Sequence, residues 1–142
     1  MKYLCIDYGQ KRTGIALSDE GGRMAFARTV LTMAGKERFW EELLTLIASE
    51  KPAALVVGLP LRNDGSDSLT TRQTRNFAAS LKRRVTLPVY FMEESYSSFA
   101  AESLLREAGK TGRKARETLD AAAAASILES FLTLDETLRV HA

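Results

Sequence analysis

The sequence predicts an α/β fold in which one mixed sheet of five strands is flanked by helices. The first 32 residues contain three apolar, strand-like runs separated only by short turns, which is typical of antiparallel strands. Beyond residue 36, two more apolar runs are separated by segments of helical periodicity, which is typical of parallel strands. We therefore expect three antiparallel N-terminal strands followed by two parallel ones. A chain of 142 residues fits a single domain, 1–142.

The N-terminal strands are expected at residues 2–8, 12–20 and 23–32. A turn around Gly9 joins the first two, and the pair Gly21-Gly22 is a hairpin signal between the second and the third. The chain therefore begins as an antiparallel meander.

A helix is expected over residues 36–50, because apolar side chains recur there at helical spacing and Pro52 follows. Phe39 and Trp40 in this helix could stack on bases, but their spacing favours a role in the core. The next segment, 53–60, reads "AALVVGLP", a continuous apolar run typical of a strand that is covered on both faces.

The loop "LRNDGSDS", residues 61–68, leads into a helix that Ser66 or Ser68 would cap and that continues to about Arg84. The segment "LPVYFMEES", residues 87–95, supplies the fifth strand. Two further helices are expected, of which the first is capped by Ser97 or Ser98 and ends near residue 108, and the second runs from Thr118 to about residue 134.

The composition is that of a soluble globular protein, with 45% hydrophobic and 27% charged residues. Cys5 is the single cysteine and lies in an apolar run, so we expect it to be buried and the compartment to be reducing. The sequence contains no signal-peptide pattern and no apolar run of about 18 residues. We therefore expect a cytoplasmic location and no membrane partner.

Basic residues are concentrated in two segments, although the net charge is only +2. One segment, residues 72–84, holds five bases and no acid, and the other, residues 110–116, holds four bases and no acid. Such clusters are expected where a protein meets a nucleic-acid backbone, although a solvated helix face has the same pattern. The second cluster consists of Lys110, Arg113, Lys114 and Arg116.

Acidic residues follow two of the predicted strands and begin one helix. Asp7 closes the first strand, the pair Glu93-Glu94 closes the fifth, and Asp120 lies near the start of the last helix. Ligands of open α/β sheets bind at the carboxyl ends of the strands, so these acids are expected to meet at one edge. Carboxylates gathered in this way repel one another unless a cation lies between them. Because all the donors are oxygens, the ion expected is Mg²⁺ or Mn²⁺.

Histidine offers no alternative set of ligands. His141 is the only histidine and stands next to the end of the chain, where we expect a frayed tail. A hard cation at a sheet edge close to unopposed bases suits the hydrolysis of phosphodiester bonds.

Four segments of the chain resemble the YqgF family, also called RuvX, of pre-16S rRNA nucleases. They are "DYGQKRTGIALSD" (7–19), "VVGLPLRNDGS" (56–66), "LPVYFMEESYSS" (87–98) and "LDAAAAASILESFL" (119–132). The resemblance implies a ribonuclease-H-like fold related to Holliday junction resolvases. It also implies a metal-dependent nuclease that trims the 5′ end of the small-subunit rRNA precursor in ribosome biogenesis.

The resemblance further implies that Asp7, Glu94 and Asp120 are the catalytic, metal-binding carboxylates. Where the family usually has aspartate and arginine on either side of the matching glutamate, this chain has Glu93 and Ser95.

Three groups of residues are expected to bind the substrate. The turn after the first strand would place glycines and bases beside the metal, the loop after the fourth strand would offer a helix start to a phosphate, and the second basic cluster would be a mobile loop that grips the substrate. The residues of the first two groups are Gly9, Lys11, Arg12 and Gly14, and Gly58, Asn63, Gly65 and Ser66.

Other functions stay open at this point. The chain could be a non-catalytic or weakly catalytic module that binds RNA or the ribosome, or a nuclease of branched, Holliday junction-like DNA. Asp7 and the turn after it also resemble the phosphate loop of the actin and sugar-kinase ATPases, but those enzymes enclose a nucleotide between two domains. Both a monomer and a homodimer are compatible with the sequence.

Overall fold

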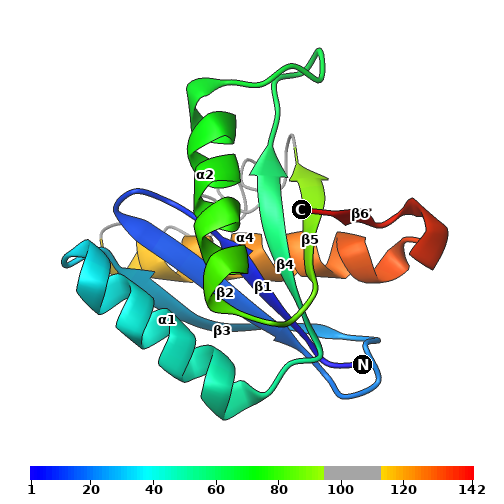
Figure 1. Ribbon diagram of the computed structural model, residues 1–142, viewed down its shortest axis with the longest axis horizontal. Coiled ribbons are helices and arrows are strands. Elements are labelled where there is room, and N and C mark those ends of the chain that lie inside the picture. The colour runs from blue at the N-terminus through cyan, green and yellow to red at the C-terminus, as the bar shows by residue number, and fades with distance from the viewer. Residues whose placement is uncertain (95–112) are drawn as a thin grey trace.

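The computed structural model describes residues 1–94 and 113–142, and the backbone alone over 113–118. One sheet runs through this part of the chain in the strand order β3-β2-β1-β4-β5-β6 (Figure 1). The strands are β1 (Tyr3–Asp7), β2 (Arg12–Ser18), β3 (Ala25–Thr32), β4 (Ala54–Pro60), β5 (Val89–Glu94) and β6 (Val140–His141). The predicted mixed sheet is confirmed: β1, β2 and β3 are antiparallel, and β4 and β5 continue the sheet parallel to β1.

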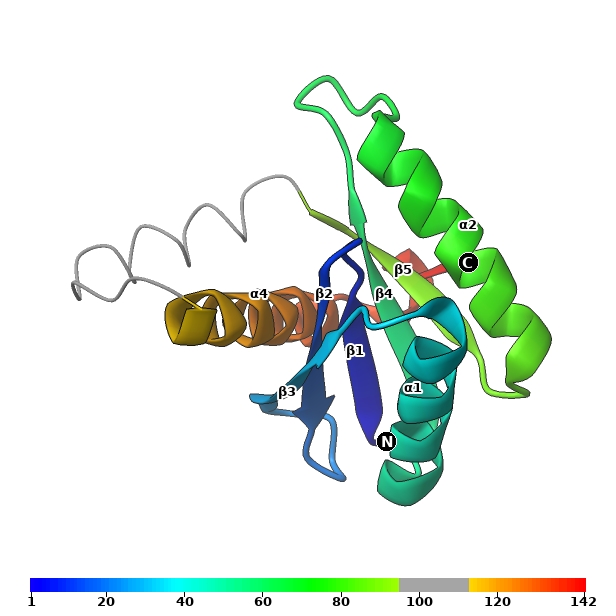
Figure 2. The ribbon, with the colours of Figure 1, turned by 90° about the vertical axis from the view of Figure 1, so that its left-hand side faces the viewer.

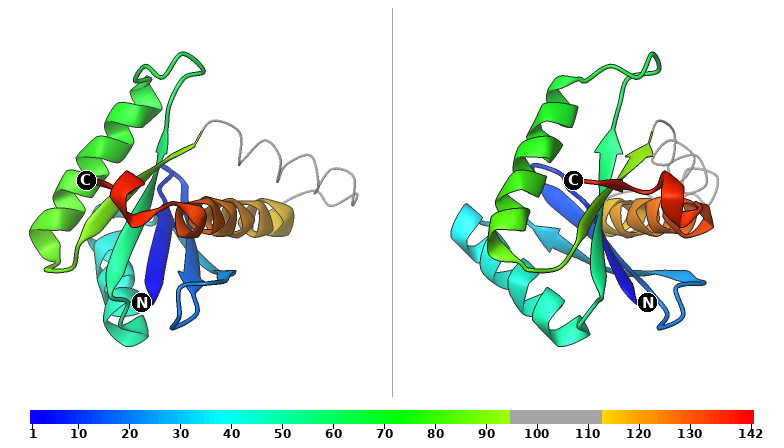
Figure 3. Two further views of the ribbon diagram at one scale, coloured as in Figure 1. Left: turned by 90° about the vertical axis from the view of Figure 1, so that its right-hand side faces the viewer. Right: turned by 45° about the vertical axis from the view of Figure 1, so that its right-hand side comes forward.

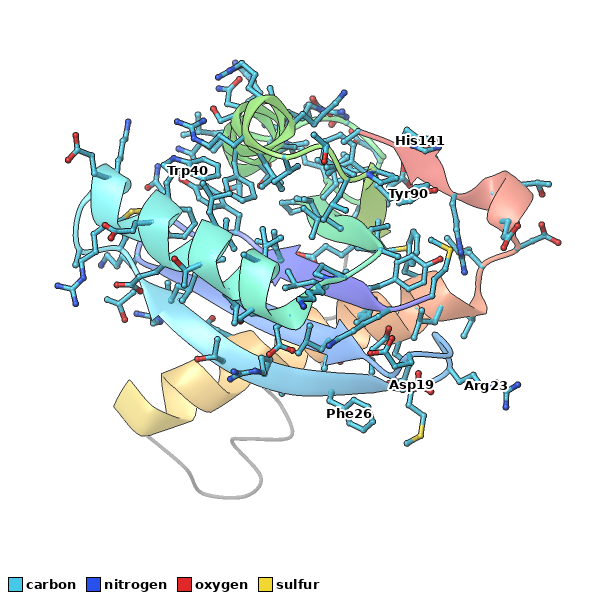
Figure 4. The ribbon with its side chains drawn as sticks, turned by 60° about the horizontal axis from the view of Figure 1, so that its bottom comes forward. Asp19, Arg23, Phe26, Trp40, Tyr90 and His141 are labelled. Carbon is cyan, nitrogen blue, oxygen red and sulfur yellow. The ribbon has the colours of Figure 1, made fainter. Side chains whose placement is uncertain are left out.

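A sixth strand differs from the expectation of five. The residues Val140–His141 pair with β5 in the antiparallel direction, so the predicted frayed tail is wrong at His141. The imidazole of His141 packs on the ring of Tyr90, with 4.3 Å between the ring centroids (Figure 4). A strand of two residues is too short to produce a pattern of alternation, which is why the sequence did not indicate it.

The helices cover both faces of the sheet. Helices α1 (Lys36–Glu50) and α2 (Leu69–Arg84) lie on one face and α4 (Arg113–Thr133) crosses the other, as Figures 2 and 3 show. Alternation along the strands divides the core accordingly. Ile6 and Val57 face α1 and α2, whereas Cys5 and Val56 face α4, where they pack against Phe131 and its neighbours. None of the helices in the described residues combines the length and the hydropathy of a transmembrane span.

The ends of three predicted elements, the start of α2, the turn between β2 and β3 and the start of α4, are defined more closely by the structure. Ser68, rather than Ser66, caps α2: its side chain accepts from the Thr71 amide, and the Thr71 hydroxyl accepts from the Ser68 amide. The loop between β2 and β3 is longer than two glycines, because β2 ends at Ser18 and β3 begins at Ala25. Within this loop the side chain of Asp19 accepts hydrogen bonds from the amides of Arg23 and Met24.

The last helix begins at Arg113, five residues before the predicted Thr118. The added residues are mostly good helix formers, and Gly112 stands immediately before them. The helix predicted to end near residue 108 lies outside the described residues.

Candidate active site

Asp7 and Glu94 reach the same face of the sheet because of strand alternation. Asp7 has the same parity in β1 as Cys5, and Glu94 has the same parity in β5 as Met92; both Cys5 and Met92 belong to the apolar cluster under α4. Glu93, one residue earlier in β5, is exposed. The strands run parallel with β4 between them, so both acids lie at the carboxyl edge of the sheet.

Gly58 in the central strand β4 leaves the space that the Glu94 carboxylate uses. A Cβ atom built at Gly58 would lie 3.2 Å from Glu94 Oε2 and 2.7 Å from Ile127 Cδ1. Glycine here is therefore a packing requirement, and Gly58 is buried in the sheet rather than lying on a substrate-facing rim.

Asp120 is held against the sheet by a close approach of two backbones. It lies about two turns into α4 rather than in the first turn, so the helix dipole gives no reason for an acid at this position. A Cβ atom on Gly14 of β2 would lie 2.0 Å from the Asp120 carbonyl oxygen, a separation that only glycine tolerates. Gly14 is thus buried beneath α4. Gly14 therefore determines how closely α4 approaches the sheet.

The three carboxylates influence one another. The pKa of Asp7 is raised well above its ordinary value, first by burial and then by repulsion from the charges of Glu94 and Asp120. The pKa of the Cys5 thiol is raised by burial and by the charges of Asp7 and Glu94. Folding therefore gathers three acids, of which the first and the last are more than a hundred residues apart in the chain, into one electrostatic group.

A cation already stands beside one of these acids. Arg12 Nε lies 2.7 Å from Asp120 Oδ2, and both side chains are partly exposed. Within residues 1–94 and 119–142, no three acidic, histidine or cysteine side chains are arranged closely enough to hold a metal ion. Charge repulsion acts over a longer range than coordination, so the acids interact without yet forming a ligand set. The carboxylate oxygens of the three acids suit a hard divalent cation, which Asp120 would bind in place of Arg12.

The turn between β1 and β2 lies beside Asp120. It lines a pocket of about 330 Å³ together with Asp120 and residues of α2, and both Lys11 and Arg12 take part in that lining. Gly9 is needed to close the turn, since a Cβ atom there would lie 2.3 Å from the Arg12 carbonyl oxygen. Sequence reasoning missed the three lining residues that α2 contributes, Thr70, Gln73 and Thr74, because α2 approaches the turn only in the folded chain.

The loop after β4, which was predicted to offer a phosphate site, does not belong to the described lining of the pocket beside Asp120. Asn63 and Gly65 are exposed, and Ser66 donates to Asp64 within the loop. The described lining of the pocket beside Asp120 comes from the β1–β2 turn and α2, not from this loop.

The predicted gripping loop is partly helical. Arg113, Lys114 and Arg116 belong to the first turns of α4, so the prediction of a loop is wrong for them. Lys110 and Ser95 lie outside the described residues. In the first basic cluster, Arg75 is paired with Asp67, so that cluster is not free of acids in the fold.

Comparisons with known proteins agree with this architecture. A protein of Nitratidesulfovibrio vulgaris strain Miyazaki F named "Putative pre-16S rRNA nuclease" is 56% identical over 142 residues, which are all of both chains. A protein of the same name from Oleidesulfovibrio alaskensis is 51% identical over 140 residues, or 99% of this chain and 97% of that one.

Among solved structures, Thermus thermophilus RuvC in complex with a Holliday junction substrate superposes with a TM-score of 0.62 at 18% identity, covering all of both chains. At that identity the likeness confirms the predicted ribonuclease-H-like fold. A sequence profile of the family described as "RuvX: Holliday junction resolvase" matches residues 1–134. The chain therefore belongs to the RuvX family.

Proposed function

We propose that this protein is a metal-dependent nuclease that hydrolyses phosphodiester bonds in RNA and processes the 5′ end of pre-16S rRNA. The observation that carries the proposal is the gathering of Asp7, Glu94 and Asp120 at one sheet edge, where the pKa of Asp7 is raised by burial and by the charges of the other two. Family membership and the names of the relatives support the same class of enzyme. The cytoplasmic location stays a prediction.

Asp7, Glu94 and Asp120 would hold the metal ion, for which Mg²⁺ and Mn²⁺ are the candidates. A divalent cation bound there supplies activation of the attacking water and stabilisation of the leaving oxygen. Asp7, which lies in strand β1 and is affected by the charges of both other carboxylates, would be the central ligand. The pKa of Asp7 is raised by burial and by repulsion among the carboxylates, and this repulsion would favour a cation at the site.

Arg12 has two tasks in this scheme. In the metal-free protein, its guanidinium neutralises Asp120 across 2.7 Å. If Asp120 served as a metal ligand, the Arg12 guanidinium would be free to bind a phosphate of the substrate. Lys11 is exposed in the same turn and adds a second positive charge beside that phosphate.

The test is a cleavage assay on an RNA that mimics the 5′ region of pre-16S rRNA, with Mg²⁺, Mn²⁺ or EDTA. We expect cleavage with either ion, none in EDTA, and none by Asp7→Asn. Cleavage that persists in EDTA or in Asp7→Asn would refute the proposed site. RNA binding without cleavage under any condition would favour the non-catalytic alternative.

A second candidate substrate is branched DNA, which the description of the family favours. The same assay therefore includes a four-way DNA junction at equal concentration. Preferential cleavage of the junction would replace RNA as the proposed substrate while leaving the roles of the carboxylates unchanged.

A further inference from the structure

A groove extends from Asp120 across the β1–β2 turn to the space between α1 and α2. It consists of two adjoining pockets, of about 330 and 350 Å³, which share Tyr8, Gln10 and Gln73. Each volume is within the range of pockets that bind small organic groups, about 300–1,000 Å³. The groove therefore leads away from the proposed cleavage site and has room for parts of a substrate.

The charge of the groove suits a polyanion. Its described lining contains four cationic side chains and a single carboxylate, that of Asp120, which is already paired with Arg12. The larger hollow between β3 and α1, about 730 Å³, is lined instead by three glutamates and two arginines. The cations of the groove are Lys11, Arg12, Lys36 and Arg84.

An unsatisfied hydroxyl marks the inner part of the groove. Thr74 is 1% exposed and lines the pocket beside Asp120, yet its Oγ1 has no hydrogen-bond partner in the described part of the chain. A buried polar atom without a hydrogen-bond partner lowers the stability of the fold, so such atoms are rare unless a ligand or water bonds to them. Thr74 can donate to, or accept from, a group that enters this pocket.

The outer part of the groove combines aromatic rings with amides. Tyr8 stacks on Phe77 with 4.4 Å between ring centroids, Trp40 stacks on Phe77 at 5.3 Å, and the Arg84 guanidinium lies 4.2 Å above Trp40. Figure 4 shows Trp40 on the side of α1 that faces α2. The amides of Gln73 and Asn76 line the same pocket. Aromatic faces with amide donors and acceptors are the groups that recognise the faces and edges of unpaired bases.

We propose that this groove binds an unpaired segment of the RNA strand adjoining the cleaved bond. This inference rests on the proposed nuclease function and specifies the form of substrate. The backbone of the segment passes Lys11 and Arg12, a polar group of one nucleotide meets Thr74, and a base enters the pocket lined by Gln73 and Trp40. A fully paired duplex hides its base edges and cannot use this pocket.

The experiment uses the fluorescence of Trp40, which is the only tryptophan in the chain. The full-length protein is titrated in EDTA with a single-stranded RNA of eight nucleotides, and with the same RNA annealed to its complement. We expect the single strand to change the fluorescence and to bind about tenfold more tightly than the duplex. Equal affinity for the two forms would overturn the proposal.

The variant Gln73→Ala/Thr74→Val removes the amide and the orphan hydroxyl, and it should weaken single-strand binding by about tenfold. Thr133→Val makes the same threonine change at an exposed position of α4 and should leave binding unchanged. Thermal melts establish that each variant folds, and Asn76→Ala, at an exposed position, provides a second groove variant. Unchanged binding by the folded groove variants would also overturn the proposal.

The experiments can refute the proposal for the groove and the proposed nuclease function independently of each other. Cleavage by the wild type in Mn²⁺ together with unchanged binding by the groove variants refutes the groove alone. Selective binding of the single strand in EDTA without cleavage in any metal leaves the groove in place and refutes the nuclease function.

Discussion

Replacing Gly14 with alanine should move α4 away from the sheet at Asp120. The added Cβ atom would lie 2.0 Å from the Asp120 carbonyl oxygen, whereas ordinary contacts begin at 3.4 Å. The helix, or the strand beneath it, must therefore shift by about 1.4 Å, the difference between the two distances. The atoms nearest to the added Cβ all belong to the backbone, so a change of rotamer cannot relieve the contact.

Two effects of Gly14→Ala follow from that shift. Overpacking of this kind typically costs about 1–3 kcal/mol of unfolding free energy. A displacement of about 1 Å at a catalytic group can lower the rate about 100-fold, so cleavage should fall much further than RNA binding. Urea unfolding measures the first effect, and single-turnover cleavage with Mn²⁺ measures the second.

Gly21→Ala is the matched control for this prediction. It adds the same methyl group where the nearest atom is 3.5 Å away, and Gly21 has no left-handed backbone angle. Its stability should stay within about 0.5 kcal/mol of the wild type, with full cleavage. If Gly14→Ala were as stable and as active as Gly21→Ala, the placement of Asp120 by this contact would be wrong.

Three further changes test other parts of the structure. Since the pKa of Asp7 is raised by burial and by Glu94, the stability of the metal-free protein should fall as the pH rises through that pKa. Asp7→Asn should remove this fall from thermal melts measured over a range of pH, and it should abolish cleavage. A variant whose melting temperature depends on pH as that of the wild type does would contradict the raised pKa. The methyl group added by Gly58→Ala should contact the side chains of Glu94 and Ile127, which can move, so we expect a loss of about 1 kcal/mol of unfolding free energy in urea and about tenfold slower cleavage. Unaltered cleavage would contradict the role of Glu94. Ser68→Ala removes the N-cap of α2 and should cost about 1 kcal/mol with cleavage retained, and an undiminished melting temperature would show that the cap adds nothing.

Much of the fold could be predicted because its signals are local. Apolar runs, glycine turns and helical periodicity indicated the first five strands and the helices α1 and α2 with small errors at their ends. The early start of α4 was missed because Thr118 resembles an N-cap although the residues before it also favour a helix. The strand β6 was missed because it is formed by pairing with β5 and has no pattern of its own.

The candidate site could be predicted in part. Strand ends and strand direction bring Asp7 and Glu94 to one edge, and alternation with Met92 would also have separated Glu94 from Glu93. The contacts of Gly14 and Gly58 are different, because they depend on how deeply α4 sits on the sheet. No local pattern records that depth, so the part that Gly14 and Gly58 play in placing the carboxylates could not be predicted.

The groove beside the site was beyond local reasoning for the same reason. Thr74 and Trp40 lie on different helices at core-like positions, and the periodicity of each helix describes only its own buried face. Their common pocket exists because α1 and α2 meet the β1–β2 turn in three dimensions.

The central claim is that folding gathers Asp7, Glu94 and Asp120 so that they bind a divalent cation together. Isothermal titration of the metal-free protein with Mn²⁺ tests it most directly, with Asp7→Asn and Asp120→Asn measured alongside the wild type. We predict saturable binding by the wild type and at least about tenfold weaker binding by each variant. Equal Mn²⁺ affinity in all three proteins, each shown to be folded, would contradict the account.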